Sequence, residues 1–482
     1  MVPMKFAVRL SPMVAILAAV TTANAADLGA RVYTKAPVAP AFSWTGFYLS
    51  GGGGYGMWDA DQQFIVRGAP IGSGEHTGGR GYFGTVGGGY DWQFNSRWVG
   101  GVFADAQFGD ISGSISVPFA DVFGSTRNNL NYAAGARLGY LVAPNVLSYI
   151  NAGYSHAEFS GANFYSHEGD SLTSGTAKFG RDGWFVGGGF ENSLNIFGIT
   201  APGWFMKSEY RVADYGGKDV AIVGAPPGTD IRFKPIIQTA STSLVYRFNA
   251  DGIPVAADTP LYTKAPAMPA SNWTGFYIGG GGGYGMSTAD STTLDASGPL
   301  DVSVRSGGSG AFGTVSGGYD QQLNGSWVAG VFADAQFGNI TQSMSSPQLL
   351  AITGTAKNDL NYAAGLRVGY LVAPKVLSYV NGGYSHADFK GAYLSNINPF
   401  GVEGYTGRTH FDGWFLGGGV ENSLNIFGVT APGWFMKTEY RLAEYNEKSI
   451  GLSDPPGSPT GFALAFKPYV QTISSSLIYR FN

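Results

Sequence analysis

The chain has 482 residues, of which 75 are glycine and none is cysteine. Charged residues make up 13% of the chain and aromatic residues 14%, the opposite of the charge-rich, aromatic-poor balance of a disordered protein. The net charge of −4 gives no basic surface for nucleic acid, and the lack of cysteine excludes disulfides and thiol chemistry.

The N-terminus has the pattern of a secretory signal peptide. A basic start precedes a short apolar run at residues 13–20, and Ala23 and Ala25 occupy the small positions of an A-x-A cleavage site. The apolar run is shorter than the roughly 18 residues that a membrane-anchoring helix needs. We therefore expect the first 25 residues to be removed and the protein to leave the cytoplasm.

The rest of the sequence is written twice. The stretch WTGFY at residues 44–48 returns at residues 273–277, and the YRFN at residues 246–249 returns at the end of the chain. Such self-similarity indicates a duplicated structural unit. The predicted organisation is a signal peptide at residues 1–25, a periplasmic leader at 26–43, a first β-barrel repeat at 44–249, an Ala/Pro-rich linker at 250–272 and a second repeat at 273–482.

Within each repeat the side chains alternate between an apolar and a small or polar type. In residues 129–140, Leu130, Tyr132 and Leu138 fall on one side of a strand, and Asn131 and Arg137 fall on the other. About eight segments of this kind occur in a repeat. In the first repeat they begin near Gly46, Gly79, Trp98, Arg127, Val146, Asp182, Trp204 and Ile236.

The connections alternate in length. Short turns are expected at residues 94–97, 143–145 and 195–203, and longer loops near residues 59–78, 110–126, 159–181 and 214–235. Alternating segments of roughly 10 residues with this loop pattern are typical of an antiparallel transmembrane β-barrel of the outer-membrane type. A soluble β-sandwich also alternates, but its apolar faces should not end in repeated Trp and Tyr.

A nucleotide-binding motif is matched by chance. Gly51, Gly53 and Gly56 fit G-x-G-x-x-G, but the polar, turn-like residues 57–61 follow where the motif requires a helix. Similar glycine clusters recur in several segments of each repeat. We interpret the glycines as relief of crowding inside a narrow barrel whose strands are strongly tilted.

Two sets of residues are the candidate sites. Tryptophans at segment starts are expected in the aromatic belts at the membrane interface, together with Trp44 and Trp273. These belt residues are Trp98, Trp184, Trp204, Trp327, Trp414 and Trp434. Charges on the inner face are expected in the lumen: Asp105, Arg137, Glu191, Lys207, Glu209, Arg211 and Arg247, with Asp334, Arg367, Glu421, Lys437, Glu439, Arg441 and Arg480 in the second repeat.

The repeats form either two eight-stranded barrels or one sixteen-stranded barrel. Eight strands enclose a lumen that side chains fill, whereas sixteen leave an aqueous channel. Each repeat ends in its own aromatic strand, and a long linker separates the two, so we favour two barrels. The inner charges then form a salt-bridged plug, the alternative being a charged constriction that selects solutes.

The YTKAP leader at residues 33–37, the WTGFY opening of the first strand and the SLVYRFN terminal strand resemble the alphaproteobacterial porin-family outer-membrane β-barrel proteins, a branch of the small OmpA-like barrels. Two features depart from this pattern: the unit is duplicated, and Asn482 follows the expected terminal Phe481. The resemblance implies an outer-membrane location and a structural role in the envelope. Its expected partners are outer-membrane lipid, lipopolysaccharide and the barrel-assembly machinery, with no nucleic acid.

Enzymatic function is not expected. The five histidines lack metal-binding motifs, and Ser155 and His156 are strand neighbours that point to opposite faces, so neither a metal nor a cofactor is predicted. The remaining alternatives to a structural protein are a porin that passes small hydrophilic solutes and a binding or adhesion module carried by the long loops. The sequence does not identify the ligand of those loops.

Overall fold

The computed structural model describes residues 43–117, 122–166, 171–196, 199–248, 272–346, 352–396, 404–426, 429–454 and 457–481. The expected signal peptide and nearly all of the leader and linker lie outside these residues. No helix in the described part of the chain is long and apolar enough to span a membrane.

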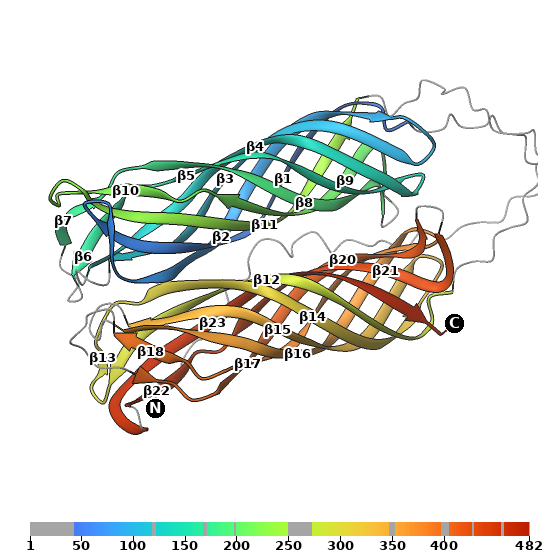
Figure 1. The fold of residues 1–482 in the computed structure, drawn as a ribbon. Coiled ribbons are helices and arrows are strands. Elements are labelled where there is room, and N and C mark those ends of the chain that lie inside the picture. The colour runs from blue at the N-terminus through green and yellow to red at the C-terminus, as the bar shows by residue number, and fades with distance from the viewer. Residues whose placement is uncertain are drawn as a thin grey trace, which may run out of the picture. The chain divides into compact units, whose positions relative to one another are not determined.

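In the part of the chain that the structure describes, the first repeat forms eight long strands (Figure 1). They are β1 (Gly46–Val66), β2 (Ala69–Gln93), β3 (Trp98–Val117), β4 (Val122–Ala143), β5 (Val146–Phe159), β8 (Phe179–Ile196), β9 (Ile199–Tyr215) and β11 (Thr229–Arg247). Among the described residues, three short strands lie between the long ones: β6 (Ala162–Ser166), β7 (Ser171–Thr176) and β10 (Lys218–Val223).

The second repeat has the same plan. Its long strands are β12 (Gly275–Asp295), β14 (Val304–Gln322), β15 (Trp327–Ser346), β16 (Ile352–Ala373), β17 (Val376–Phe389), β20 (Thr409–Ile426), β21 (Val429–Tyr445) and β23 (Ser458–Arg480). Its short strands are β13 (Gly298–Pro299), β18 (Tyr393–Asn396), β19 (Gly404–Tyr405) and β22 (Lys448–Asp454).

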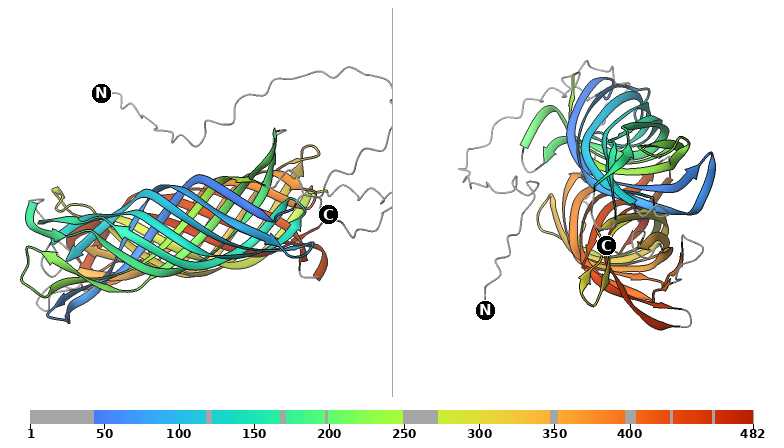
Figure 2. Two further views of the ribbon diagram at one scale, coloured as in Figure 1. Left: turned by 90° about the horizontal axis from the view of Figure 1, so that it is seen from above. Right: turned by 90° about the vertical axis from the view of Figure 1, so that its left-hand side faces the viewer.

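Each repeat closes into its own antiparallel barrel. Successive long strands pair as neighbours, and the first strand pairs with the last: Tyr48 of β1 faces Arg247 of β11, and Tyr277 of β12 faces Arg480 of β23. Each set of strands can be followed around its ring in Figure 2. The prediction of two eight-stranded barrels is confirmed, and the sixteen-stranded alternative is wrong, because its ring would need β11 and β12 as neighbours.

The predicted faces of the strands are also confirmed. On β4 and β5, Leu138 is 43% exposed and Ile150 is 67% exposed, whereas Asn131 and Arg137 are buried. Apolar side chains therefore point outward and polar ones inward. Strict alternation would place Asn129 on the inner face with Asn131, but the strand register shifts beside it and this residue lies on the outside.

The predicted long loops are wrong for most of their length. Residues 59–66 continue β1 and residues 69–78 continue β2, with a tight turn at Arg67 and Gly68, which both have positive φ. The same holds for residues 57–61, which are strand rather than turn. Strands extend here because the backbone ladder continues, although residues 59–63 are mostly polar and residues 64–66 are all apolar, so that the sequence shows no period-two alternation. We call this the long-hairpin end of the barrel, and the opposite end, with its turn at residues 94–97, the short-turn end.

Inward glycines let neighbouring strands approach closely. A Cβ added at Gly52 would lie 2.1 Å from the carbonyl oxygen of Thr242 on β11, whereas one added at the outward Gly51 would meet nothing nearer than 4.0 Å. The crowding is therefore on the inner side of this part of the wall, as the sequence predicted.

Candidate functional site: the barrel lumen

A cluster of four charged side chains lies inside the first barrel toward the short-turn end. We call Asp91, Arg137, Glu191 and Arg247 the Asp91 cluster. Arg137 donates to Asp91 (2.8 Å) and to Glu191 (3.2 Å), and Arg247 donates to Glu191 and to Asp91, each at 2.7 Å. Each carboxylate is thus shared by two guanidinium groups from different strands.

A second cluster lies further along the lumen. We call Asp105, Lys207, Glu209 and Arg211 the Asp105 cluster. Arg211 donates two hydrogen bonds to Asp105 (3.0 and 2.7 Å) and one to Glu209 (2.8 Å). The other oxygen of Glu209 accepts hydrogen bonds from Tyr149 and Asn151, at 2.8 and 2.9 Å, and lies 3.8 Å from the Lys207 ammonium.

Both clusters are balanced in charge and almost completely buried. Each contains two cations and two carboxylates, and no side chain of either cluster is more than 12% exposed. Burying a charge is costly unless it is paired and hydrogen-bonded, and here each carboxylate accepts at least two hydrogen bonds, those of Asp105 both coming from Arg211. Arg137 also lies over the ring of Tyr48 and Arg247 over that of Trp44, each 4.5 Å from the ring centroid.

Apolar layers pack on either side of the charges. Toward the short-turn end, Val99, Leu147 and Val245 are fully buried with Trp44. Toward the long-hairpin end the lumen is crossed by Trp58, Phe159, Phe185 and Phe233, all fully buried. Among the described residues of the first repeat, the lumen is therefore filled by alternating apolar and charged layers.

The second barrel repeats this arrangement. Arg367 and Arg480 share Asp320 and Glu421, and Arg441 donates to Asp334 and Glu439, with Lys437 3.6 Å from Glu439. The structure thus brings together all fourteen predicted lumen charges, seven in each barrel.

Asp91 and its counterpart Asp320 were missed by the sequence analysis. Both are completely buried at the centre of their clusters. The signal was present, because Asp91 stands between two aromatic residues, Tyr90 and Trp92, that are both exposed on the outer face. In a strand, the residue between two outward aromatics points inward.

The predicted belt tryptophans lie at both ends of the apolar band. Trp98 and Trp204 lie toward the short-turn end, where Trp98 packs against Tyr140 and Trp204 against Tyr246. Trp184, 56% exposed, lies toward the long-hairpin end, because β8 runs in the opposite direction from β9. In the second repeat, Trp327 and Trp434 are placed like the first pair and Trp414 like Trp184.

Trp44 and Trp273 are not belt residues, contrary to the prediction. Each is 1% exposed. The Trp44 side chain lies at the short-turn end of the lumen, where its indole nitrogen donates to the carbonyl oxygen of Pro144 at 3.2 Å. It precedes β1, so the alternation of the strand does not fix the direction of its side chain. Its role is to close the short-turn end of the barrel.

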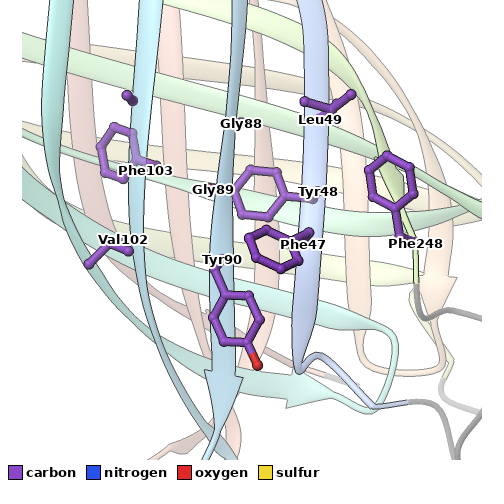
Figure 3. A pocket seen from close by; sticks show the side chains of 10 residues that line it. Phe47, Tyr48, Leu49, Gly88, Gly89, Tyr90, Val102, Phe103 and Phe248 are labelled. Carbon is purple, nitrogen blue, oxygen red and sulfur yellow. The ribbon is translucent and has the colours of Figure 1, made fainter.

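A pocket of about 750 Å³ lies at the wall of the first barrel across β1, β2 and β3. Phe47, Leu49, Tyr90, Val102 and Phe248 are exposed around it, and Gly88 contributes no side chain (Figure 3). The exposed part of its lining is therefore the lipid-facing surface. In the described part of the chain, no group of three or more His, Asp or Glu side chains is arranged to hold a metal ion.

Comparison with known proteins agrees with this architecture. The family described as "Outer membrane protein beta-barrel domain" matches residues 13–248 and again residues 261–481. The 31 kDa outer-membrane immunogenic protein of Brucella melitensis is 28% identical over 221 residues, which is 44% of this chain and 87% of the relative. The 22 kDa outer membrane protein of Rhizobium leguminosarum is 33% identical over 186 residues, covering 38% of this chain and 71% of the relative.

Among solved structures, one of the attachment invasion locus protein Ail of Yersinia pestis matches with a TM-score of 0.19 and 15% identity, covering 41% of this chain and 99% of that one. The toluene transporter TodX of Pseudomonas putida matches with a TM-score of 0.24 and 10% identity, covering 89% of each chain. From the two family matches and the two closed barrels, the chain belongs to the outer membrane β-barrel protein family, and it is a protein of the bacterial outer membrane.

Proposed function

We propose that the protein is a structural component of the outer membrane, in which two sealed barrels anchor long hairpins at the cell surface. The observation that carries this proposal is the lumen: balanced clusters of buried charges lie between fully buried apolar layers. A path for hydrophilic solutes needs accessible polar groups, whereas the charged side chains in this lumen are buried and bonded to one another. The envelope role of the small barrels that the sequence resembles supports the same reading.

A catalytic function has little support. Ser155 is buried and hydrogen-bonded to Tyr215 (2.8 Å), whereas His156 lies on the outer face against Asp182 (2.7 Å). The serine hydroxyl and the imidazole are therefore on opposite sides of β5. A nucleophile needs its base within hydrogen-bonding reach, so this pair does not form a catalytic dyad.

Conductance tests the sealed lumen. The purified chain is reconstituted into planar bilayers, and single-channel currents are recorded beside a general porin as a positive control. We expect no large, stable conductance steps. Large porin-like steps would overturn the structural proposal in favour of solute transport.

The absence of cysteine allows a test of orientation. We propose that the long-hairpin end faces the outside and the short-turn end faces the periplasm, with assembly machinery and lipopolysaccharide as partners. Ala221 on β10 and Ser96 in a short turn are both exposed, and each is replaced by cysteine in a separate variant. A membrane-impermeant thiol reagent is then applied to intact cells that carry Ala221→Cys or Ser96→Cys. We expect labelling of Ala221→Cys only, with Ser96→Cys labelled after permeabilisation; the reverse pattern would refute this orientation.

A further inference from the structure

We infer that the second barrel carries a binding site for a phosphorylated glycolipid of the outer leaflet, and that the first barrel has a weaker version of it. The site is an outward-facing group of Lys357, Lys390, Arg408, Asp359 and Asp388, which we call the Lys390 patch. It lies where β16, β17 and β20 leave the apolar band. The inference rests on the orientation proposed above.

Two of the three cations of the Lys390 patch lie around one carboxylate. Arg408 donates to both oxygens of Asp359, at 2.7 and 2.8 Å, and the Lys390 ammonium lies 3.6 Å from Asp359. The backbone N–H of Lys390 donates to the carbonyl of Lys357 at 2.8 Å, which fixes the two lysines side by side. The side chains of Lys390 and Arg408 are 57% and 55% exposed, so both retain donors that face solvent.

Three aromatic rings form a shelf beside the patch. His386 stacks on Tyr362 with centroids 4.4 Å apart and on His410 with centroids 5.6 Å apart, and both ring pairs are within 20° of parallel. Tyr362, His386 and His410 come from β16, β17 and β20; His386 is buried between the other two rings, and the exposed rings are those of Tyr362 and His410. Aromatic faces are suitable surfaces for sugar rings, and Lys and Arg are suitable partners for phosphate.

The position of the patch along the barrel axis indicates which kind of anion it binds. Lys357 is five residues along β16 from the exposed Tyr362, and Lys390 is six residues along the chain from the exposed Tyr384. At about 3.3 Å per residue and a strand tilt near 40°, both lie roughly 13–15 Å beyond this aromatic level. This is the zone of lipid headgroups and inner sugars, and the patch is on the outer wall rather than at a hairpin tip. A membrane glycolipid reaches it more directly than a soluble partner.

The first repeat provides a comparison within the same chain. Its equivalent positions hold Arg127, Asn129, Glu158, Ser160 and Lys178. Arg127 there lies 3.9 Å from another carboxylate, that of Asp110, and the neutral Asn339 replaces that carboxylate in the second repeat. The first repeat thus has two cations against two carboxylates, and the second has three cations against two.

The aromatic shelf is also smaller in the first repeat. Gly180 stands in the position of His410, so only Tyr132 and His156 stack there, with centroids 4.7 Å apart. A Cβ added at Gly180 would lie 2.8 Å from the His156 ring, so the first barrel does not accept the third ring without rearrangement. Both differences point to the second barrel as the stronger anion site.

Binding is measured on the full chain in detergent, with lipopolysaccharide that retains only lipid A and inner-core sugars as the probe. The same probe after removal of its phosphates is the control. In Lys390→Ser, which installs the residue of the first repeat, we expect binding to weaken about fivefold, as for the loss of one lysine near an anionic headgroup. The matched variant Lys178→Ser in the first barrel should change binding less than twofold.

Three outcomes would overturn the inference: equal binding by wild type and Lys390→Ser, equal effects of the two lysine variants, or equal binding of the dephosphorylated probe. Stronger Lys390-dependent binding of a soluble sulfated oligosaccharide would also overturn it, in favour of a glycan partner. Because the assay is done in detergent, a failure here leaves the conductance and labelling results intact. Failure of the labelling test, with binding preserved, would instead refute the proposed orientation.

Discussion

At the scale of single residues, the lumen shows how a membrane protein keeps charges in a dry interior. Asp91 accepts hydrogen bonds from both Arg137 and Arg247, and nothing in the cluster is left to a single partner. Such a network is costly to assemble but more costly to break, because removal of one member leaves the others buried without compensation. Asp91 therefore contributes strongly to the stability of the barrel.

We expect Asp91→Asn to lower the free energy of unfolding by about 3–5 kcal/mol, the range for breaking a buried ion pair. The measurement is denaturant unfolding of the chain in lipid vesicles. Asp219→Asn is the control, because Asp219 pairs with Arg232 (2.7 Å) on the exposed surface of β10 and β11 and should matter far less. Equal losses in the two variants would contradict a stabilising role for the Asp91 cluster.

Glu75 predicts a pH dependence at the long-hairpin end. Burial raises the pKa of this carboxyl to about 7, against the lowering effects of its hydrogen bond with Ser116 and of nearby His76. Because the folded pKa lies above the ordinary value of 4.5, folding favours the protonated form. The stability it contributes is complete below pH 4.5 and declines as the pH rises toward 7.

We therefore expect hydrogen exchange in the β1–β2 hairpin, corrected for intrinsic rates, to be faster at pH 8 than at pH 5. Glu75→Gln, which stays neutral, should reduce this difference. The remainder belongs to His76, whose pKa is raised by its hydrogen bond with Asp59, so that its charged form also favours folding at low pH. A pH effect of unchanged size in Glu75→Gln would contradict the assignment to Glu75.

At the scale of elements, the sequence predicted the strands where they cross the membrane and failed where they leave it. Between the belts, one face meets hydrocarbon and the other a crowded polar lumen, so residue type alternates with a period of two. Beyond the belts this contrast is lost: residues 59–63 are mostly polar and residues 64–66 are all apolar, so no period-two pattern separates a strand from a loop there. Trp44 was misplaced for a related reason, since it stands before the first strand, where periodicity gives no direction.

Position along a strand should decide the cost of an outward charge. Ala136 lies on the outer face of β4, midway between Tyr132 and Tyr140, and Asn129 lies on the same face beyond Tyr132. We expect Ala136→Arg to reduce stability in lipid by about 2–4 kcal/mol and Asn129→Arg by about 0–1 kcal/mol. Similar values for the two variants, measured in the same vesicles, would show that the apolar band is placed wrongly.

At the scale of the whole molecule, the barrel class and the choice of two barrels were predictable, because each repeat carries its own opening and terminal strand. The composition of the charge clusters was only partly predictable. Seven of their eight members in each barrel were predicted from alternation, but which of them share a partner depends on distances across the lumen that no local pattern records. Arg137 and Glu191, 54 positions apart, illustrate this.

Separate closure predicts separate responses to damage. Asp91→Asn should increase hydrogen exchange mainly in peptides from β1 to β11, and Asp320→Asn mainly in peptides from β12 to β23. Mass spectrometry of the exchanged full chain measures both regions at once. Uniform changes across both repeats in either variant would indicate that the barrels open as a single cooperative unit.

The way each barrel closes has a consequence for biogenesis. The terminal strands contain the nearly identical stretches LVYRF and LIYRF, and each meets its opening strand in the same alignment. The opening strand β1 therefore has two nearly equivalent strands with which it could pair, β11 and β23, and β23 is about twice as far along the chain as β11. A doubling of chain length separates them by only about 0.6 kcal/mol of closure entropy. Correct pairing of β1 with β11 must then come from timing, since β11 is synthesised, exported and delivered before β23.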